Sequence, residues 1–119
     1  MAAGETEYVL QEEHHATFDA NGEAWVRGLG PNVYGERWTI EATQTRVENS
    51  VSESRLEVYR NGTTQIVEGT YSGNQDNSNT RMELNTGEKL WYKWTRGDPG
   101  AQAILTLTGK RFVKGRRGY

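Results

Sequence analysis

Several features that would point to a particular chemistry are missing from this chain of 119 residues. It has no cysteine, which excludes disulfides, thiolate nucleophiles and cysteine-ligated zinc. The only two histidines are the neighbours His14 and His15, whose side chains point to opposite faces of a strand and do not chelate one metal ion in the simplest geometry. We therefore predict no metal site, no cofactor and no catalytic residues.

Long apolar segments are also absent. No stretch approaches the ~18 apolar residues of a membrane helix, and the first residues lack the basic and apolar regions of a secretory signal. The net charge is only -2, so there is no general attraction to nucleic acid or to an acidic membrane. We expect a protein made in a cytoplasm, with no membrane contact and with nucleic acid unlikely as a partner.

Hydrophobic residues make up only 34% of the chain, so its core must be thin. Four Trp, six Tyr and two Phe offset this shortage, because each buried aromatic side chain removes roughly 150–250 Å² from water. The length suits one domain with one core. No window carries the apolar stripe of a helix, and alternation of apolar and polar residues recurs instead, which is typical of strands.

Two segments predict β-hairpins. In residues 55–68 the dipeptide Asn61-Gly62 fits a two-residue turn, since both residue types tolerate positive φ. That turn would place Leu56 opposite Val67. In residues 80–95 a glycine-containing loop of three residues would join two further strands.

The whole chain holds about eight such strands at spacings of roughly 8–12 residues, a pattern typical of sandwiches and barrels. We predict an all-β fold: a single β-sandwich of about eight short antiparallel strands, jelly-roll-like, with extended N- and C-terminal arms. No crossover helices are available for a βαβ arrangement. The residues that alternation places on the inward face include Trp38, Ile40, Ala42, Leu90, Tyr92 and Trp94.

The two ends differ from the middle in charge. Residues 1–13 are acidic and weakly apolar, whereas residues 110–119 contain five basic residues and no acid. We predict an N-terminal arm at 1–13, a β-sandwich domain at 14–109 and a basic C-terminal arm at 110–119. The opposed charges of the arms would suit head-to-tail contacts between copies.

Exposed aromatic and basic side chains form the predicted interface. Trp91 lies opposite the inward face of its strand, and Trp25 is the second candidate. A sandwich strand buries one face, so aromatic residues on the other face mark contacts with partners. The predicted interface residues are Tyr8, Trp25, Trp91, Lys110, Arg111, Lys114, Arg116, Arg117 and Tyr119.

Residues 69–79 are almost wholly amide, hydroxyl and glycine residues, with one aromatic residue. Such a mixture binds sugars, because amides and acids bond hydroxyl groups and an aromatic ring stacks on a pyranose. The alternative is a long loop that satisfies its own backbone. The candidate ligand residues are Tyr71, Asn74, Gln75 and Asp76.

Three stretches carry a resemblance to known proteins: GTYSGNQD at 69–76, GEKL at 87–90 and WTRGDPGAQA at 94–103. With them, the pattern of residues 15–109 resembles small β-sandwich virion accessory proteins of tailed phages of actinobacteria. The resemblance implies a non-enzymatic component present in many copies of a particle. A virion protein leaves the host by lysis and needs no signal peptide.

We therefore expect a non-enzymatic structural component of a tailed-phage virion, as a head decoration, collar or tail appendage. It would act through protein–protein assembly contacts with other virion proteins, in multiple copies or as a homo-oligomer. The alternative is a carbohydrate-binding β-sandwich module that aids adsorption to a glycan of the host cell surface. A small β-sandwich enzyme is a third alternative, weakened by the absence of an acid–base or nucleophile set in the sequence.

Overall fold

The computed structural model describes residues 5–32, 34–61 and 66–114. Over these ranges the chain forms nine strands and no helix, and so contains no helix of the length and apolar character needed to cross a membrane. In chain order the strands are β1 (Glu5–Thr17), β2 (Ala24–Leu29), β3 (Glu36–Glu48), β4 (Arg55–Arg60), β5 (Ile66–Ser72), β6 (Gln75–Ser78), β7 (Met82–Leu84), β8 (Leu90–Thr95) and β9 (Gln102–Lys114).

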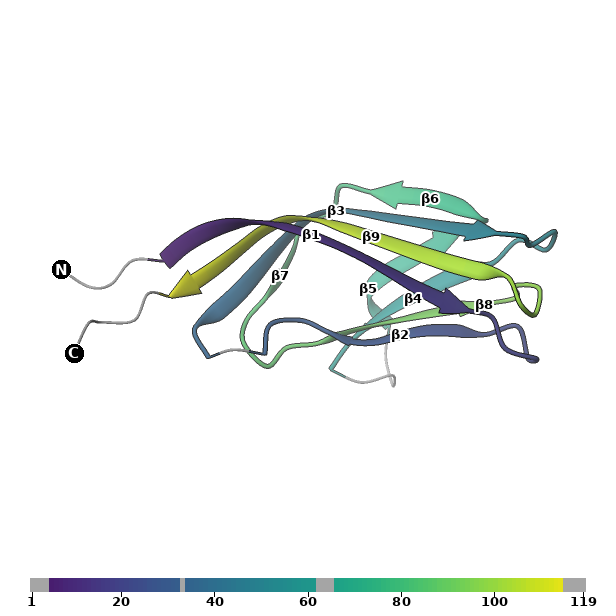
Figure 1. The fold of residues 1–119 in the computed structure, drawn as a ribbon, viewed down its shortest axis with the longest axis horizontal. Coiled ribbons are helices and arrows are strands. Elements are labelled where there is room, and N and C mark those ends of the chain that lie inside the picture. Colours follow the sequence, from purple (N-terminus) through teal and green to yellow (C-terminus); the bar gives the residue numbers. More distant parts are fainter. Residues whose placement is uncertain (1–4, 33, 62–65, 115–119) are drawn as a thin grey trace.

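The strands form two antiparallel sheets that pack face to face (Figure 1). The first sheet has the order β1-β9-β3-β6, and the second has the order β2-β8-β4-β5. β7 also pairs with β3, at residues 38–40, whereas β6 pairs with residues 43–46, so the two short strands share one position. Each sheet has four strand positions, and the chain crosses repeatedly from one sheet to the other. This arrangement is a jelly roll. The predicted all-β sandwich is confirmed.

The core lies between the two sheets and contains the largest side chains of the inward faces. Trp94 and Tyr92 of β8 are almost fully buried, and their ring centroids lie 6.5 Å apart. Trp94 Nε1 donates a 2.8 Å hydrogen bond to Thr45 Oγ1 on the opposite sheet. The indole therefore buries its ring without leaving its N–H unpaired, which would be costly.

Alternation predicted the inward faces correctly, with one exception in β3. Trp38 and Ile40 are buried, but Ala42 is only half-buried. The pairing of β3 with β9 shifts between Ile40 and Ala42. This bulge moves the next inward positions to Thr43 and Thr45, both buried.

Neither predicted hairpin has the expected pairing. Residues 80–95 form no hairpin, because β7 pairs with β3 while β8 lies in the other sheet. In the first hairpin Leu56 pairs with Tyr71 instead of Val67, and the register shifts again before Tyr59. Asn61 has the positive φ of 56° that the predicted turn requires, whereas Gly62 lies outside the described residues.

The described parts of the predicted arms are strands. β1 and β9 pair over thirteen consecutive positions without a register shift, from Glu5 opposite Lys114 to Thr17 opposite Gln102. The predicted boundaries at 13 and 110 therefore fall inside continuous strands. Residues 5–13 and 110–114 were expected as separate arms because of their charge, yet those opposite charges let the two ends pair with each other.

The outer parts of three strands form a distinct region, which we call the ribbon end. It consists of residues 5–9 of β1, 36–37 of β3 and 110–114 of β9. Figure 1 shows the paired ends of β1 and β9 reaching past β2 and β8, and the molecule measures 56 × 24 × 21 Å. We call the remainder of the two sheets the sandwich body.

Candidate assembly surface

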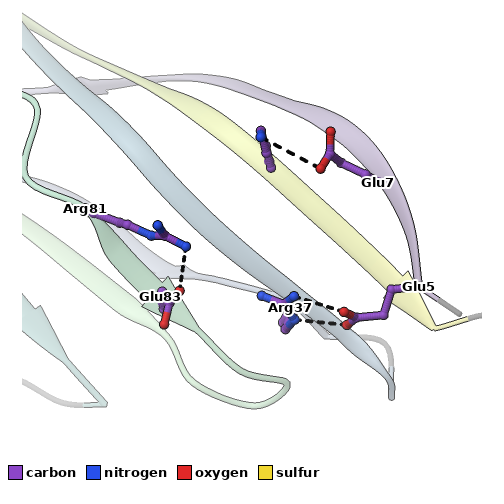
Figure 2. A network of polar contacts seen from close by, with 6 residues as sticks. Glu5, Glu7, Arg37, Arg81 and Glu83 are labelled. Carbon is purple, nitrogen blue, oxygen red and sulfur yellow. Dashed lines mark hydrogen bonds and ion pairs between the residues drawn. The ribbon is translucent and has the colours of Figure 1, made fainter.

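One arginine ties the three strands of the ribbon end together. Arg37 of β3 donates two hydrogen bonds of 2.9 Å, from Nε and Nη2, to the carboxylate of Glu5 on β1 (Figure 2). Its guanidinium also lies 4.1 Å from the ring centroid of Phe112, on the intervening strand β9. These hydrogen bonds lower the pKa of Glu5 and raise the pKa of Arg37. Bidentate geometry of this kind is the strongest form of carboxylate pairing.

Further charges of the ribbon end also pair within the chain. Lys110 Nζ lies 3.8 Å from Glu7 Oε1. Arg111 Nε lies 3.5 Å from Glu36 Oε2, and its guanidinium carbon is 5.1 Å from the ring centroid of Tyr8. The opposed charges expected to link one copy to the next are thus engaged inside one copy. The basic residues Lys110 and Arg111 stabilise the ribbon.

β1 is an edge strand of the first sheet. One side of β1 pairs with β9, and no strand pairs with its other side among the described residues. Such an edge offers a row of unpaired backbone donors and acceptors to another chain. Natural edge strands are usually protected by short length, bulges, proline or lysine. β1 has thirteen residues, a continuous register, no proline and no lysine.

The side chains of this edge are mainly acidic, with one apolar exception. β1 carries four glutamates and no lysine or arginine. Glu12 and Glu13 lie 3.5 Å and 2.9 Å from His14 Nε2 and His15 Nε2 on the same strand. Val9, in contrast, is 81% exposed and lies on the ribbon end. The edge is therefore accessible and selects against a second strand of the same charge.

The predicted aromatic contacts lie outside the core, in differing surroundings. Tyr8 is 46% exposed on β1. Trp25 and Trp91 are half-buried on the outer face of the second sheet. The ring of Trp25 is flanked by Arg27 Cζ at 4.7 Å and Lys93 Nζ at 5.2 Å. Cationic side chains therefore lie against both Trp25 and Tyr8, and Tyr8 is the one on the edge strand β1.

The other predicted interface residues are at or beyond the tip of the ribbon end. Lys114 is exposed, and its backbone N–H donates a 3.0 Å hydrogen bond to Gly35 O. Arg116, Arg117 and Tyr119 lie outside the described residues. The described part of the predicted basic arm is therefore the last segment of β9.

The four predicted ligand residues do not form one site. The Asn74 carboxamide accepts from Ser54 N–H at 3.0 Å and donates to the carbonyls of Ser50 and Ser52 at 3.2 Å and 3.1 Å. Its hydrogen bonds fix the loop before β4, which gives Asn74 a structural role. The backbone of Tyr71 pairs in β5, and its side chain lies outside the described part of the structure.

Gln75 and Asp76 instead line a groove on the outer face of the first sheet. The groove has a volume of about 370 Å³ and receives side chains from β1, β9, β3 and β6. Sequence reasoning identified only these two of its residues, since the others lie far away along the chain. It also missed Glu5 and Arg37, although the alternating acids at 5 and 7 are a signal for a charged strand.

Comparisons with known proteins bear on the fold. No family model matches the chain, and no curated protein matches it. A solved structure of Bacillus endospore appendages, described as a novel family of disulfide-linked pili, matches with a TM-score of 0.57 and 12% sequence identity. The match covers 97% of this chain and 96% of that chain. At this identity the likeness shows a shared β-sandwich fold over the full length.

Proposed function

We propose that this chain is a non-enzymatic structural subunit that assembles in many copies through the free edge of β1. The observation that carries the proposal is the thirteen-residue edge, which has a regular register, no bulge, no proline and no lysine. Addition of a strand from another chain would supply main-chain hydrogen bonds along this edge. Such contacts need no metal ion and no disulfide, which suits a chain without cysteine.

The acidic character of the edge limits the geometry of assembly. Two β1 edges placed side by side would bring eight glutamates together, because each copy contributes the four of β1. The favoured partner is a different, less acidic edge of the next copy. An interface between two different surfaces repeats from copy to copy and generates rings or filaments. We therefore propose an open or cyclic polymer in place of a symmetric dimer.

A tailed-phage virion is the setting that we propose, with the chain as a head decoration, collar or tail appendage. The support for this setting is the sequence resemblance of residues 69–103. The similarity in fold to a pilus protein is consistent with a subunit that polymerises. Because this chain has no cysteine, its polymer would be held by non-covalent contacts.

A matched pair of valine substitutions tests the assembly edge. Val9→Lys places a lysine on the free edge, which disfavours strand addition. Val51→Lys makes the same change at an equally accessible valine away from the edge, 96% exposed compared with 81% for Val9. In sedimentation velocity, we expect the mass of the wild type and of Val51→Lys to rise with concentration, and the mass of Val9→Lys to stay low.

Two results would contradict the proposal. The first is a wild-type protein that remains monomeric up to millimolar concentration. The second is a Val9→Lys variant that assembles as well as the wild type does. Mass spectrometry of purified phage particles tests the virion setting, and we expect many copies of the chain per particle. Finding the chain in infected cells but not in particles would reject that setting.

A further inference from the structure

The groove on the outer face of the first sheet is separate from the free edge of β1. Its floor is formed by Ile104 and Thr106 of β9, the strand between β1 and β3. Polar side chains surround this floor on both sides. They are Glu13 from β1, Gln44 and Arg46 from β3, and Gln75 and Asn77 from β6. Thr45 and Asp76 also line the groove, but they pair with each other on the opposite face of these two strands.

The chemistry of these side chains favours a neutral ligand. The side chains on the groove face include one carboxylate, one guanidinium and three carboxamides, so their charges cancel. A phosphate would need several cationic or N–H donors together. A hard divalent cation would need converging oxygen ligands, and the described residues contain no group of three acidic, histidine or cysteine side chains placed to hold a metal ion.

A sugar matches this mixture of groups. Each hydroxyl group of a sugar is both a donor and an acceptor, and neighbouring hydroxyls pair with planar groups such as carboxylate, carboxamide and guanidinium. The small apolar floor at Ile104 can lie under the C–H face of a ring. A volume of about 370 Å³ falls in the range of small-ligand pockets.

The groove is already ordered before a ligand binds. Gln75, Asp76 and Asn77 pair in register with residues 44–46 of β3. Asp76 Oδ1 accepts a 2.8 Å hydrogen bond from the Asn77 N–H, and Glu13 Oε2 lies 2.9 Å from His15 Nε2. The backbone that carries these side chains is therefore fixed by strand pairing, so binding does not have to order the chain itself.

We propose that this groove binds a neutral carbohydrate, with Glu13, Arg46 and Gln75 bonding its hydroxyl groups above Ile104. The site does not depend on assembly, because it lies on the face of the sheet and the assembly contact lies at its edge. The two proposals therefore fail separately. The Val9→Lys variant is expected to bind sugar as the wild type does.

Titration of the ¹⁵N-labelled full chain with neutral sugars tests the site. The probes are glucose, galactose, mannose and N-acetylglucosamine, as monomers and as short oligomers. We expect at least one of them to give saturable amide shifts centred on residues 44–46, 75–77 and 104–106. Inorganic phosphate and Ca²⁺ serve as charged probes, and we expect no saturable shifts from them.

Two exposed arginines provide a matched pair of variants. Arg46 and Arg81 each lie near the glutamate two residues further on, with side chains 58% and 66% exposed. Arg46→Gln should weaken sugar binding about tenfold, the effect of one hydrogen bond to a charged group, and Arg81→Gln should leave it unchanged. The proposal is overturned if no sugar gives saturable shifts at tens of millimolar, if a charged probe binds in their place, or if Arg46→Gln binds as the wild type does.

Discussion

Strands β1, β3 and β9 run through both the sandwich body and the ribbon end, but the two regions are stabilised in different ways. In the body, the inward residues of these strands include fully buried apolar side chains, and Ile40 and Leu105 have no exposed surface. In the ribbon end, Glu5, Arg37 and Lys110 remain partly exposed and pair by charge. Burial of apolar area is the larger effect, whereas exposed ion pairs contribute little individually. We therefore expect the ribbon end to open more easily than the sandwich body.

The change between the two regions can be followed along the inward face of β9. Leu105 and Leu107 are buried in the core, and Arg111 two positions beyond Gly109 contacts Glu36 instead. Gly109 marks the transition, because a Cβ at this position would lie 2.0 Å from the Thr39 carbonyl oxygen. The backbones of β9 and β3 approach each other closely here, beside the bulge in β3.

The largest expected effect is on the sandwich body. Leu105→Ala removes a fully buried side chain and should lower the free energy of unfolding by about 3 kcal/mol. Val9→Ala removes an exposed side chain of the ribbon end and should change it by less than about 0.5 kcal/mol. Urea denaturation of both variants measures the difference. An equal loss of unfolding free energy in the two variants would show that the two regions do not differ in this way.

An intermediate and local effect is expected from the arginine of the ribbon end. Arg37→Gln removes the bidentate pair with Glu5 and the contact with Phe112. We expect little change in global stability but several-fold faster amide exchange at residues 5–9. Arg55→Gln is the control, because Arg55 is an exposed arginine that lies 3.8 Å from Glu57 in the body. Unchanged exchange at residues 5–9 would show that this arginine does not hold the ribbon.

The smallest effect is the response of the ribbon end to acid. Hydrogen bonding by Arg37 lowers the pKa of Glu5 in the folded state, below the value of about 4.3 for an unfolded chain. The unfolded state then binds more protons, so this contribution to stability is present above that pH and is lost as the pH falls through the folded pKa. Amide protection factors at residues 5–9 should fall below about pH 4.

Glu5→Gln provides the control for this pH dependence. The variant has no carboxyl group to titrate at this position, so its ribbon end should show a weaker response between neutral and acid pH. The pKa values of Glu88 and Asp98 are also lowered, by hydrogen bonds from the backbone N–H groups of Asn85 and Val51. The wild type and Glu5→Gln both keep Glu88 and Asp98, which lie in loops. An identical response in both proteins would show that Glu5 is not the group responsible for the acid sensitivity.

Local pattern predicted the faces of strands but not their partners. The alternation of Leu90, Tyr92 and Trp94 is a property of one strand, and it is visible in the sequence alone. The partner of a strand depends on distant residues, which is why residues 80–95 resembled a hairpin although their two strands lie in different sheets. The bulge before Ala42 arises where β3 and β9 approach closely, and only the paired strands reveal it.

The same reason explains what was missed in the candidate sites. Gln75 and Asp76 stood out in a polar segment, but Glu13, Arg46 and Ile104 reach the same groove from three other strands. The charges at the two ends of the chain were visible, yet Glu5 and Lys114 become neighbours only when β1 pairs with β9. The predicted arms form a ribbon because β1 and β9 are neighbours in the sheet, and composition alone does not reveal that pairing.

Amide hydrogen exchange of the full chain in dilute and concentrated solution tests the central claim most directly. If copies add strands at the free edge, peptides covering β1 should gain protection as concentration rises, while peptides covering the central strands β4 and β8 should not. Val9→Lys should abolish that gain. Growth in mass without any added protection of β1 would contradict the account, since the copies would then be joined through another surface.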